Sequence, residues 1–398
     1  MFEFITYASY ISVLILLNWI DYRVYKTIIN PIFWLSIPFT VVLAACLLFN
    51  QRLGFIPFYS PSLWLWTVGL CLFWAGGHLV TLAGRKLTTH RVQECAPGKL
   101  VHIIFLACIG FMAVKLVTAG GDMAIGSKEL GEEVSIGGVV GRVANILMIA
   151  FPFYVYERVN KYIKVLLLAL LFVFLTTLGT KTWLMATVLA AIIMMISTKR
   201  LKLNVKLLIS SLVILASLFF LYYYLVLYAK MDSFNRLAEF VSRHFYFYFT
   251  SGILPMGEYV KAHDFNVVNS YFHPIIGLIK TWNGEQIMEH SNVWITTDTL
   301  LGTQSNVYTF FGTFYLSGTV LSYTFYSLFY GLWCYLFYEI ARARNNVFLH
   351  IANAFNCAIL FFGWYNCGFG LLRIWEIAIL SCLLYFISRV SVVNAKPL

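Results

Sequence analysis

Charged residues are scarce in this sequence. Only 11% of its 398 residues are Asp, Glu, Lys or Arg, whereas 61% are hydrophobic and the mean hydropathy is +0.80. In a soluble domain, charged residues alone make up near a quarter of the chain. This deficit excludes an ordinary soluble globular protein.

Several chemical signatures are missing as well. The chain has no Walker loop, no GxSxG elbow, no HExxH and no dinucleotide fingerprint. Its eight cysteines follow no zinc, redox or disulfide spacing, and most lie inside apolar runs. His, Cys and carboxylates do not occur at metal-ligand spacings, so we expect no metal and no cofactor. An enzyme built from this sequence would work with lysine, arginine and one base.

What the chain does have is repeated apolar runs of about 17–25 residues, the length that crosses a bilayer. Only helices and closed barrels satisfy their backbone groups in lipid, and the run from Val165 to Leu171 lacks the alternation of a barrel strand. The first run has neither a basic leader nor a small-x-small cleavage site, so we expect a retained helix rather than a signal peptide. The sequence therefore predicts an all-α polytopic integral membrane protein with about 11 transmembrane helices. The predicted spans are 4–20, 32–49, 62–83, 100–118, 139–156, 162–178, 182–197, 205–228, 318–338, 347–365 and 372–389.

The basic residues predict the orientation of these spans. More than half of the 28 Lys and Arg residues lie in every second connection and in the C-terminal tail. By the positive-inside rule that side is cytoplasmic, with the N-terminus outside and the C-terminus inside. The net charge of +11 then reflects membrane topology, and we expect no nucleic-acid partner.

The predicted organisation has three parts. Residues 1–228 hold spans one to eight, 229–317 form one large extracytoplasmic loop, and 318–398 hold spans nine to eleven and a cytoplasmic tail. The loop is far longer than an ordinary connection, which points to a functional role. It begins with an amphipathic stretch, Asp232 to Tyr248, that is typical of a helix at a membrane surface. One face of that helix would carry Arg236, Glu239 and Arg243, and another Leu237, Val241, His244 and Tyr248.

Three cations are expected at the external ends of spans. Lys181 follows the short turn Leu178-Gly179-Thr180 and opens a helix, where backbone N–H groups favour a phosphate. Arg142 and Arg373 lie early in their spans, and arginine suits bidentate phosphate contacts. The alternatives are a snorkelling lysine, interface anchors, or an ion pair between Arg373 and Glu376.

The amphipathic stretch offers a second group of candidates. Arg236 and Arg243 supply fixed cations, and His244 could act as a general base for a sugar hydroxyl. The alternative is a surface helix in which Glu239 pairs with the arginines. The histidines inside apolar runs, His78 and His102, have no acid at a matching position in the sequence, so we expect no His–Asp pair there.

Three local segments carry a resemblance to a known family. The turn 178–184 places small residues and a base before a helix, 243–252 is aromatic and ends in glycine, and 306–312 closes the large loop. Together with the architecture, they resemble the Wzy-type polymerases of bacterial O-antigen and capsular oligosaccharide repeat units. The chain departs from that pattern in having Lys181 where arginine is commoner and in lacking an acid near residue 317.

This resemblance implies a metal-independent glycosyltransferase of the bacterial inner membrane, acting on its periplasmic side. Such an enzyme moves a growing glycan from undecaprenyl pyrophosphate to the non-reducing end of a new lipid-linked repeat unit. Membrane lipid, a chain-length regulator and a flippase are the other implied partners. Under this reading His244, Arg243 and Lys181 are catalytic. Arg142, Arg236, Arg373, Tyr248 and Tyr308 bind substrate, with aromatic rings of 245–249 and 308–315 stacking on sugars.

Three other readings stay open. An O-antigen ligase shares this architecture and differs in its acceptor. A flippase or transporter would carry out no chemistry. A membrane acyltransferase would be expected to contain a His–Asp signature inside the membrane.

Overall fold

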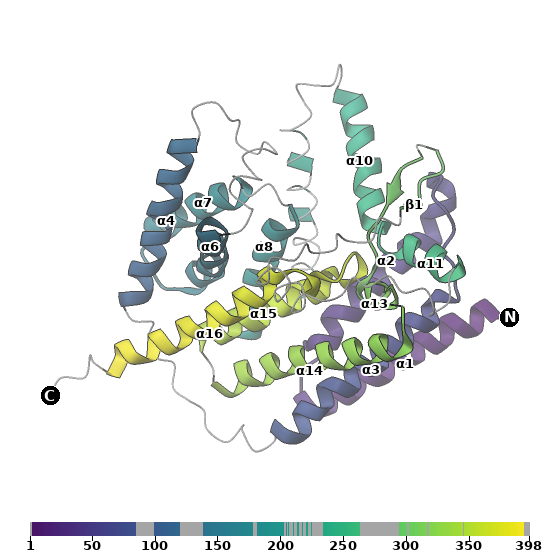
Figure 1. Cartoon of the computed structure of the whole chain (residues 1–398), viewed down its shortest axis with the longest axis horizontal. Coiled ribbons are helices and arrows are strands. Elements are labelled where there is room, and N and C mark those ends of the chain that lie inside the picture. Colours follow the sequence, from purple (N-terminus) through teal and green to yellow (C-terminus); the bar gives the residue numbers. More distant parts are fainter. Residues whose placement is uncertain are drawn as a thin grey trace. The chain divides into compact units, whose positions relative to one another are not determined.

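The computed structural model describes residues 2–84, 99–119, 138–177, 181–202, single positions between 204 and 224, 234–262, 294–300, 302–316, 318–344 and 346–393. Helices dominate these ranges (Figure 1). Every predicted span within them is helical. The predicted span 205–228 lies largely outside the described residues.

The chain divides into two compact units, each assembled from three segments. Unit 1 comprises 1–86, 239–339 and 359–372, and unit 2 comprises 87–238, 340–358 and 373–398. Both units therefore draw on the early, middle and late parts of the sequence. The linear division into bundle, loop and final spans describes the order of the chain, whereas the units describe its packing.

Unit 1 is built on helices α1 (Phe2–Tyr25), α2 (Pro31–Leu53) and α3 (Ser62–Gly84), together with α14 (Val320–Arg344) up to Glu339. The amphipathic segment forms α10 (Phe234–Thr250), whose residues from Glu239 onward belong to this unit. Shorter elements follow it: α11 (Ile253–Ala262), strands β1 (Ile295–Thr296) and β2 (Gln304–Ser305), and α13 (Phe310–Tyr315). The two strands pair antiparallel, and the 3₁₀ turns η2 (Phe362–Trp364) and η3 (Gly368–Gly370) complete the unit.

Unit 2 contains α4 (Lys99–Ala119), α6 (Gly138–Tyr156), α7 (Lys161–Thr177) and α8 (Lys181–Ser197). Most of α15 (Val347–Phe361) and nearly all of α16 (Leu372–Val393) belong to it as well. Helix α6 packs against both α7 and α8. The unit is thus a bundle in which the helices that begin near Arg142, Lys181 and Arg373 are all present.

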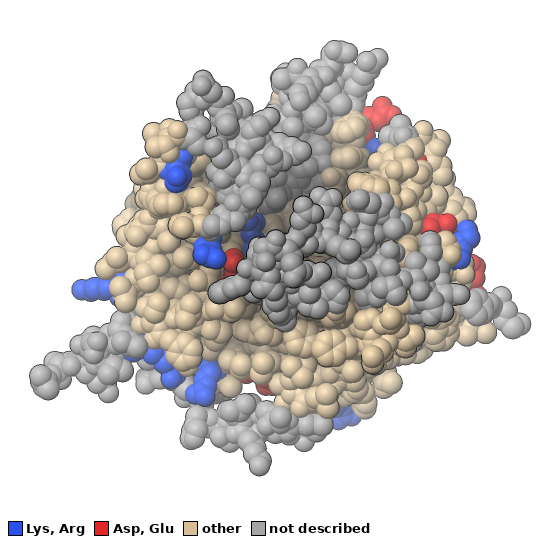
Figure 2. Space-filling model, in the orientation of Figure 1, with Lys and Arg blue, Asp and Glu red and all other residues tan. Residues whose placement is uncertain are grey.

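The surfaces of these helices are apolar where a soluble protein would be charged. Phe4 on α1, Val117 on α4 and Leu166 on α7 are largely exposed, and many other large apolar side chains share this property. On the face drawn in Figure 2, charged side chains form small, separated groups on an otherwise uncharged described surface. Exposed apolar surface of this extent is expected where lipid, rather than water, surrounds the protein.

Six of the described helices are long and apolar enough to cross a membrane: Glu3–Tyr25, Pro31–Leu53, Ser62–Thr81, Lys99–Thr118, Val139–Tyr156 and Val347–Trp364. The coarse expectation of an all-α, membrane-embedded protein is therefore supported. The number of about 11 spans stays a prediction.

Local sequence explains where helices begin and end. Asn30 caps α2 by accepting a hydrogen bond from the Phe33 amide at 2.9 Å, and Pro31 takes the first helical position. Gly54 ends α2 with a left-handed backbone (φ 73°). The predicted span 347–365 matches the apolar stretch Val347–Trp364, in which α15 ends at Phe361 and the 3₁₀ turn η2 continues it.

Helices α3 and α14 approach closely through glycines. A Cβ on Gly76 would lie 2.0 Å from the Leu328 carbonyl oxygen, and one on Gly331 would lie 1.8 Å from that of Phe73. Small residues let helix backbones come together in lipid, where no hydrophobic drive joins helices. This reciprocal glycine contact therefore fixes α14 against α3.

Candidate functional site

Cationic residues stand at the beginnings of three helices of unit 2. Arg142 is exposed in the first turns of α6, and Arg373 is the second residue of α16. Lys181 begins α8, as expected, but its side chain lies outside the described part of the structure. The guanidinium of Arg373 lies 5.3 Å from the ring centroid of Trp183, two residues after Lys181. The starts of α8 and α16 are thus neighbours.

A hydrogen bond joins the starts of α6 and α16. The buried side chain of Asn145, three residues after Arg142, donates through Nδ2 to Oε2 of Glu376, three residues after Arg373. Residues three apart on a helix lie on one side of it. The structure therefore brings α6, α8 and α16 together at the ends where the sequence predicted external cations. The helix N-termini add partial positive charge there.

Arg243 on α10 has a different environment from the one expected. Its guanidinium forms a bidentate pair with Asp298, with Nε donating to Oδ2 at 2.8 Å and Nη2 donating to Oδ1. Asp298 is 1% exposed and Arg243 is 23% exposed. The sequence offered Glu239 as the partner of the arginines, and for Arg243 that alternative is wrong.

Asp298 itself is held by the region around the strand pair. The Leu300 amide donates to Oδ1 at 3.0 Å, and the backbone of Asp298 bridges that of Phe55 just after α2. The Phe55 ring also lies 5.3 Å from the Arg243 guanidinium. The pair therefore ties α10 to the loop hairpin and to the end of α2. Sequence reasoning missed Asp298, because nothing local distinguishes it from the other loop acids.

His244 and Tyr248 lie within a group of aromatic rings on α10. The His244 ring stacks on Phe240 at 5.1 Å and meets Tyr248 edge-on at 4.8 Å. Tyr248 also lies 6.1 Å from the ring of Tyr365. Both side chains are half-buried, so each retains some exposed surface.

Tyr308 is part of the packing of unit 1. Its side chain is 3% exposed, and its ring centroid lies 5.8 Å from that of Tyr259. Burial raises the pKa of Tyr308 above its ordinary value, and the nearby Tyr259 raises it further. The aromatic residues of α13 are buried too. The expected stacking of sugars on the 308–315 rings is therefore not supported, since protein neighbours occupy these rings.

The eight candidate residues do not all belong to one unit. Arg142, Lys181 and Arg373 are in unit 2, as is Arg236, whose side chain lies outside the described part of the chain. Arg243, His244, Tyr248 and Tyr308 are in unit 1. The structure thus brings together the starts of α6, α8 and α16, which carry Arg142, Lys181 and Arg373. The α10 residues Arg243, His244 and Tyr248 form a group within unit 1.

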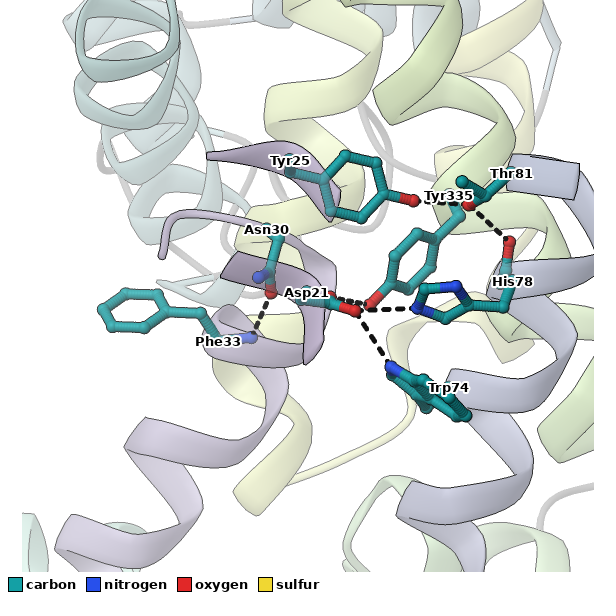
Figure 3. A network of polar contacts seen from close by, with 9 residues as sticks. Asp21, Tyr25, Asn30, Phe33, Trp74, His78, Thr81 and Tyr335 are labelled. Atoms are coloured by element: carbon teal, nitrogen blue, oxygen red, sulfur yellow. Dashed lines mark hydrogen bonds and ion pairs between the residues drawn. The ribbon is translucent and has the colours of Figure 1, made fainter. Parts of the chain in front are cut away.

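A polar network that the sequence did not predict lies within unit 1 (Figure 3). Asp21 at the end of α1 is fully buried and contacts His78 Nε2 at 2.8 Å. Trp74 Nε1 donates to the same carboxylate at 2.9 Å, and the Tyr335 hydroxyl donates to its other oxygen. The expectation that His78 has no acidic partner is therefore wrong. Asp21 was overlooked because it follows the first apolar run and reads as part of a basic cytoplasmic connection.

This network connects three helices. Asp21 comes from α1, Trp74 and His78 from α3, and Tyr335 from α14. Next to it, the hydroxyls of Tyr25 and Thr81 share a hydrogen bond of 2.5 Å, which links α1 to α3 again. His102 on α4, in contrast, packs its ring against Phe153 at 5.4 Å. A buried carboxylate with three donors stabilises the contact between the helices that supply them.

Within the described ranges, no three His, Cys, Asp or Glu side chains gather in a way that would hold a metal ion.

No curated protein and no solved structure matches the chain. One family model, described as a family of unknown function (DUF6337), matches residues 54–394, which include α3 and every later helix of both units. The chain therefore belongs to the family of unknown function DUF6337.

Proposed function

We propose that this protein is a membrane glycosyltransferase that polymerises lipid-linked oligosaccharide repeat units outside the cytoplasm. It transfers a growing glycan from undecaprenyl pyrophosphate to the non-reducing end of a new lipid-linked unit. The protein resides in the bacterial inner membrane with about 11 spans, its N-terminus periplasmic and its C-terminus cytoplasmic. A chain-length regulator and a flippase are its expected partners.

One observation carries this proposal: the starts of α6, α8 and α16 come together, and each carries a cation. Arg142 and Arg373 lie one helical turn from the Asn145–Glu376 hydrogen bond, and Arg373 lies over Trp183 beside the start of α8. Positive charge at the external ends of spans runs against the positive-inside rule and therefore calls for a reason. A diphosphate leaving group supplies one, because fixed cations stabilise the negative charge that develops as the glycosidic bond breaks.

The α10 residues have a supporting part in this proposal. His244 is the candidate general base for the acceptor hydroxyl, and Tyr248 is the aromatic side chain available beside it. Arg243 uses Nε and one Nη2 hydrogen to bind Asp298. Its remaining guanidinium N–H groups would be the ones that bind phosphate.

The deciding experiment uses purified protein in liposomes with lipid-linked repeat units and no energy source. Elongated glycan in the absence of ATP, nucleotide sugar and divalent metal supports the polymerase. Transfer only when lipid A–core is added would establish the ligase alternative instead. Repeat units that change leaflet without lengthening would leave a flippase.

A membrane acyltransferase is a second candidate, favoured by the Asp21–His78 pair. That reading requires a histidine, oriented by an acid, that a substrate can reach, and the His78 side chain is 17% exposed. The competing explanation is structural, since Trp74 and Tyr335 also bind Asp21 and the Trp74 ring lies 4.2 Å from that of His78. Acyl transfer from a thioester donor to a glycan, abolished by His78→Gln without loss of folded protein, would establish this candidate over the polymerase.

A further inference from the structure

The contact between α6 and α16 in unit 2 contains polar groups that lack hydrogen-bond donors. Asn145 is 2% exposed, yet its Oδ1 atom has no partner in the described part of the chain. A buried side-chain oxygen without a donor is uncommon, and each such case needs a physical explanation.

The hydrogen-bonding chemistry of Asn145 and Glu376 determines which of their oxygen atoms lack a donor. A carboxylate only accepts hydrogen bonds, so Asn145 must direct its Nδ2 toward Oε2 of Glu376 and turn Oδ1 elsewhere. The other carboxylate oxygen of Glu376, Oε1, receives no hydrogen bond from the described residues. Among the described residues, two acceptors without a donor therefore remain at one place, and a donor from outside this set would satisfy both.

The side chains around Asn145 and Glu376 indicate which kind of hydrogen-bond donor could bind there. A divalent cation is a poor candidate, because one carboxylate and one amide oxygen supply few of the ligands that it needs. Arg373 and Arg142 lie one turn from the pair and would repel a cation. A neutral group with several O–H donors suits two adjacent acceptors, and such groups are abundant in sugars.

We propose that Asn145 and Glu376 form a carbohydrate subsite, in which Asn145 Oδ1 and Glu376 Oε1 accept hydrogen bonds from neighbouring hydroxyls of one sugar. This inference deepens the proposed glycosyltransferase and depends on it for its biological meaning. It places the sugar next to Arg373, the residue assigned above to the diphosphate. Neither Asn145 nor Glu376 emerged from the sequence as a site residue.

The most informative variant is Glu376→Gln. A glutamine can accept from Asn145 and donate back to its Oδ1, so the two amides satisfy each other and no acceptor is left for a ligand. The variant should therefore fold, unfold at a higher temperature than wild type, and bind sugar at least about tenfold more weakly. Asn353→Leu is the matched control, because Asn353 is a buried asparagine of unit 2 on α15 whose Oδ1 accepts a hydrogen bond from the Cys357 thiol.

Binding is measured by saturation-transfer NMR on protein in nanodiscs, with D-glucose, D-galactose, D-mannose and L-rhamnose as probes. We expect saturation transfer to at least one of these sugars with wild type and Asn353→Leu, and loss of it with Glu376→Gln. Absence of transfer to all four with wild type, or equal transfer with Glu376→Gln, would overturn the subsite and leave water as its occupant.

The outcome is separable from that of the proposed function. Elongation in liposomes with sugar binding insensitive to Glu376 would retain the polymerase and refute the subsite. Sugar binding lost in Glu376→Gln without elongation by wild type would retain the subsite and refute the polymerase.

Discussion

Arg373 carries the sharpest prediction for a single residue. Arg373→Gln keeps a polar side chain over Trp183 and removes the charge. If the guanidinium stabilises the leaving diphosphate, elongation should slow by roughly 10²–10³-fold, as when one preorganised donor is lost. Glycan chain length and initial rate in the liposome assay are the measurements. Arg389→Gln is the control, since Arg389 lies near the other end of α16, over Tyr385, and should leave the rate unchanged.

The Arg243–Asp298 pair predicts a stability effect that would otherwise be mistaken for catalysis. Asp298→Ala leaves a partly buried guanidinium uncompensated, and removing one partner of a buried pair costs about 3–5 kcal/mol. Glu258→Gln is the comparison, because its contact with Lys261 at 3.6 Å is partly exposed on both sides and should be worth about 1 kcal/mol or less. Thermal unfolding in detergent measures both. Similar small losses in the two variants would contradict a stabilising role for Asp298.

At the scale of residues, the sequence identifies the candidate cations but does not identify the residues that pair across the fold. Arg142, Lys181 and Arg373 could be found because charge interrupting an apolar run is visible locally. Asp298 lies 55 residues from Arg243, and Glu376 lies 231 residues from Asn145. Pairing at such separations depends on the fold, which periodicity does not report.

Among the helices, the contact between α3 and α14 makes a testable case. Gly331→Ala would place a Cβ 1.8 Å from the Phe73 carbonyl oxygen. Backbone atoms would have to move to remove this steric clash. We expect a clearly lower unfolding temperature or loss of folded protein. Gly110→Ala on α4 is the matched control, because nothing lies within 4 Å of a Cβ there. That variant should be neutral or slightly more stable, since Ala favours helix over Gly by about 1 kcal/mol. Equal behaviour of the two would refute the close approach.

The helices themselves were predictable because long apolar runs have one stable conformation in lipid. The pattern of segment 232–248 also predicts an amphipathic helix, and the segment forms α10 with Val241 buried and Glu239 exposed. The short elements of the loop were not anticipated. Strands of two residues and a six-residue helix such as α13 carry too little periodicity to be seen without their tertiary contacts.

For the molecule as a whole, the alternation of basic connections predicts a topology that fusions can test. A reporter active only outside the cytoplasm should be active when fused after residue 128 or 270 and silent after residue 92 or 202. The physical reason is that Lys and Arg near span ends are retained on the cytoplasmic side. The opposite pattern at any two of these positions would change the number of spans and move the Arg142, Lys181 and Arg373 ends to the other face.

The Asp21 network has a consequence for the order in which the chain is made. Asp21 and Tyr335 are 314 residues apart, so the ribosome delivers one of the carboxylate's donors only after most of the polypeptide has left it. Until then Asp21 has only the two donors from α3, Trp74 and His78. Until α14 is made, helix α1 therefore ends in an acid that lacks one of its hydrogen-bond donors. Quality control that recognises such an exposed charge would discard chains that stall before α14.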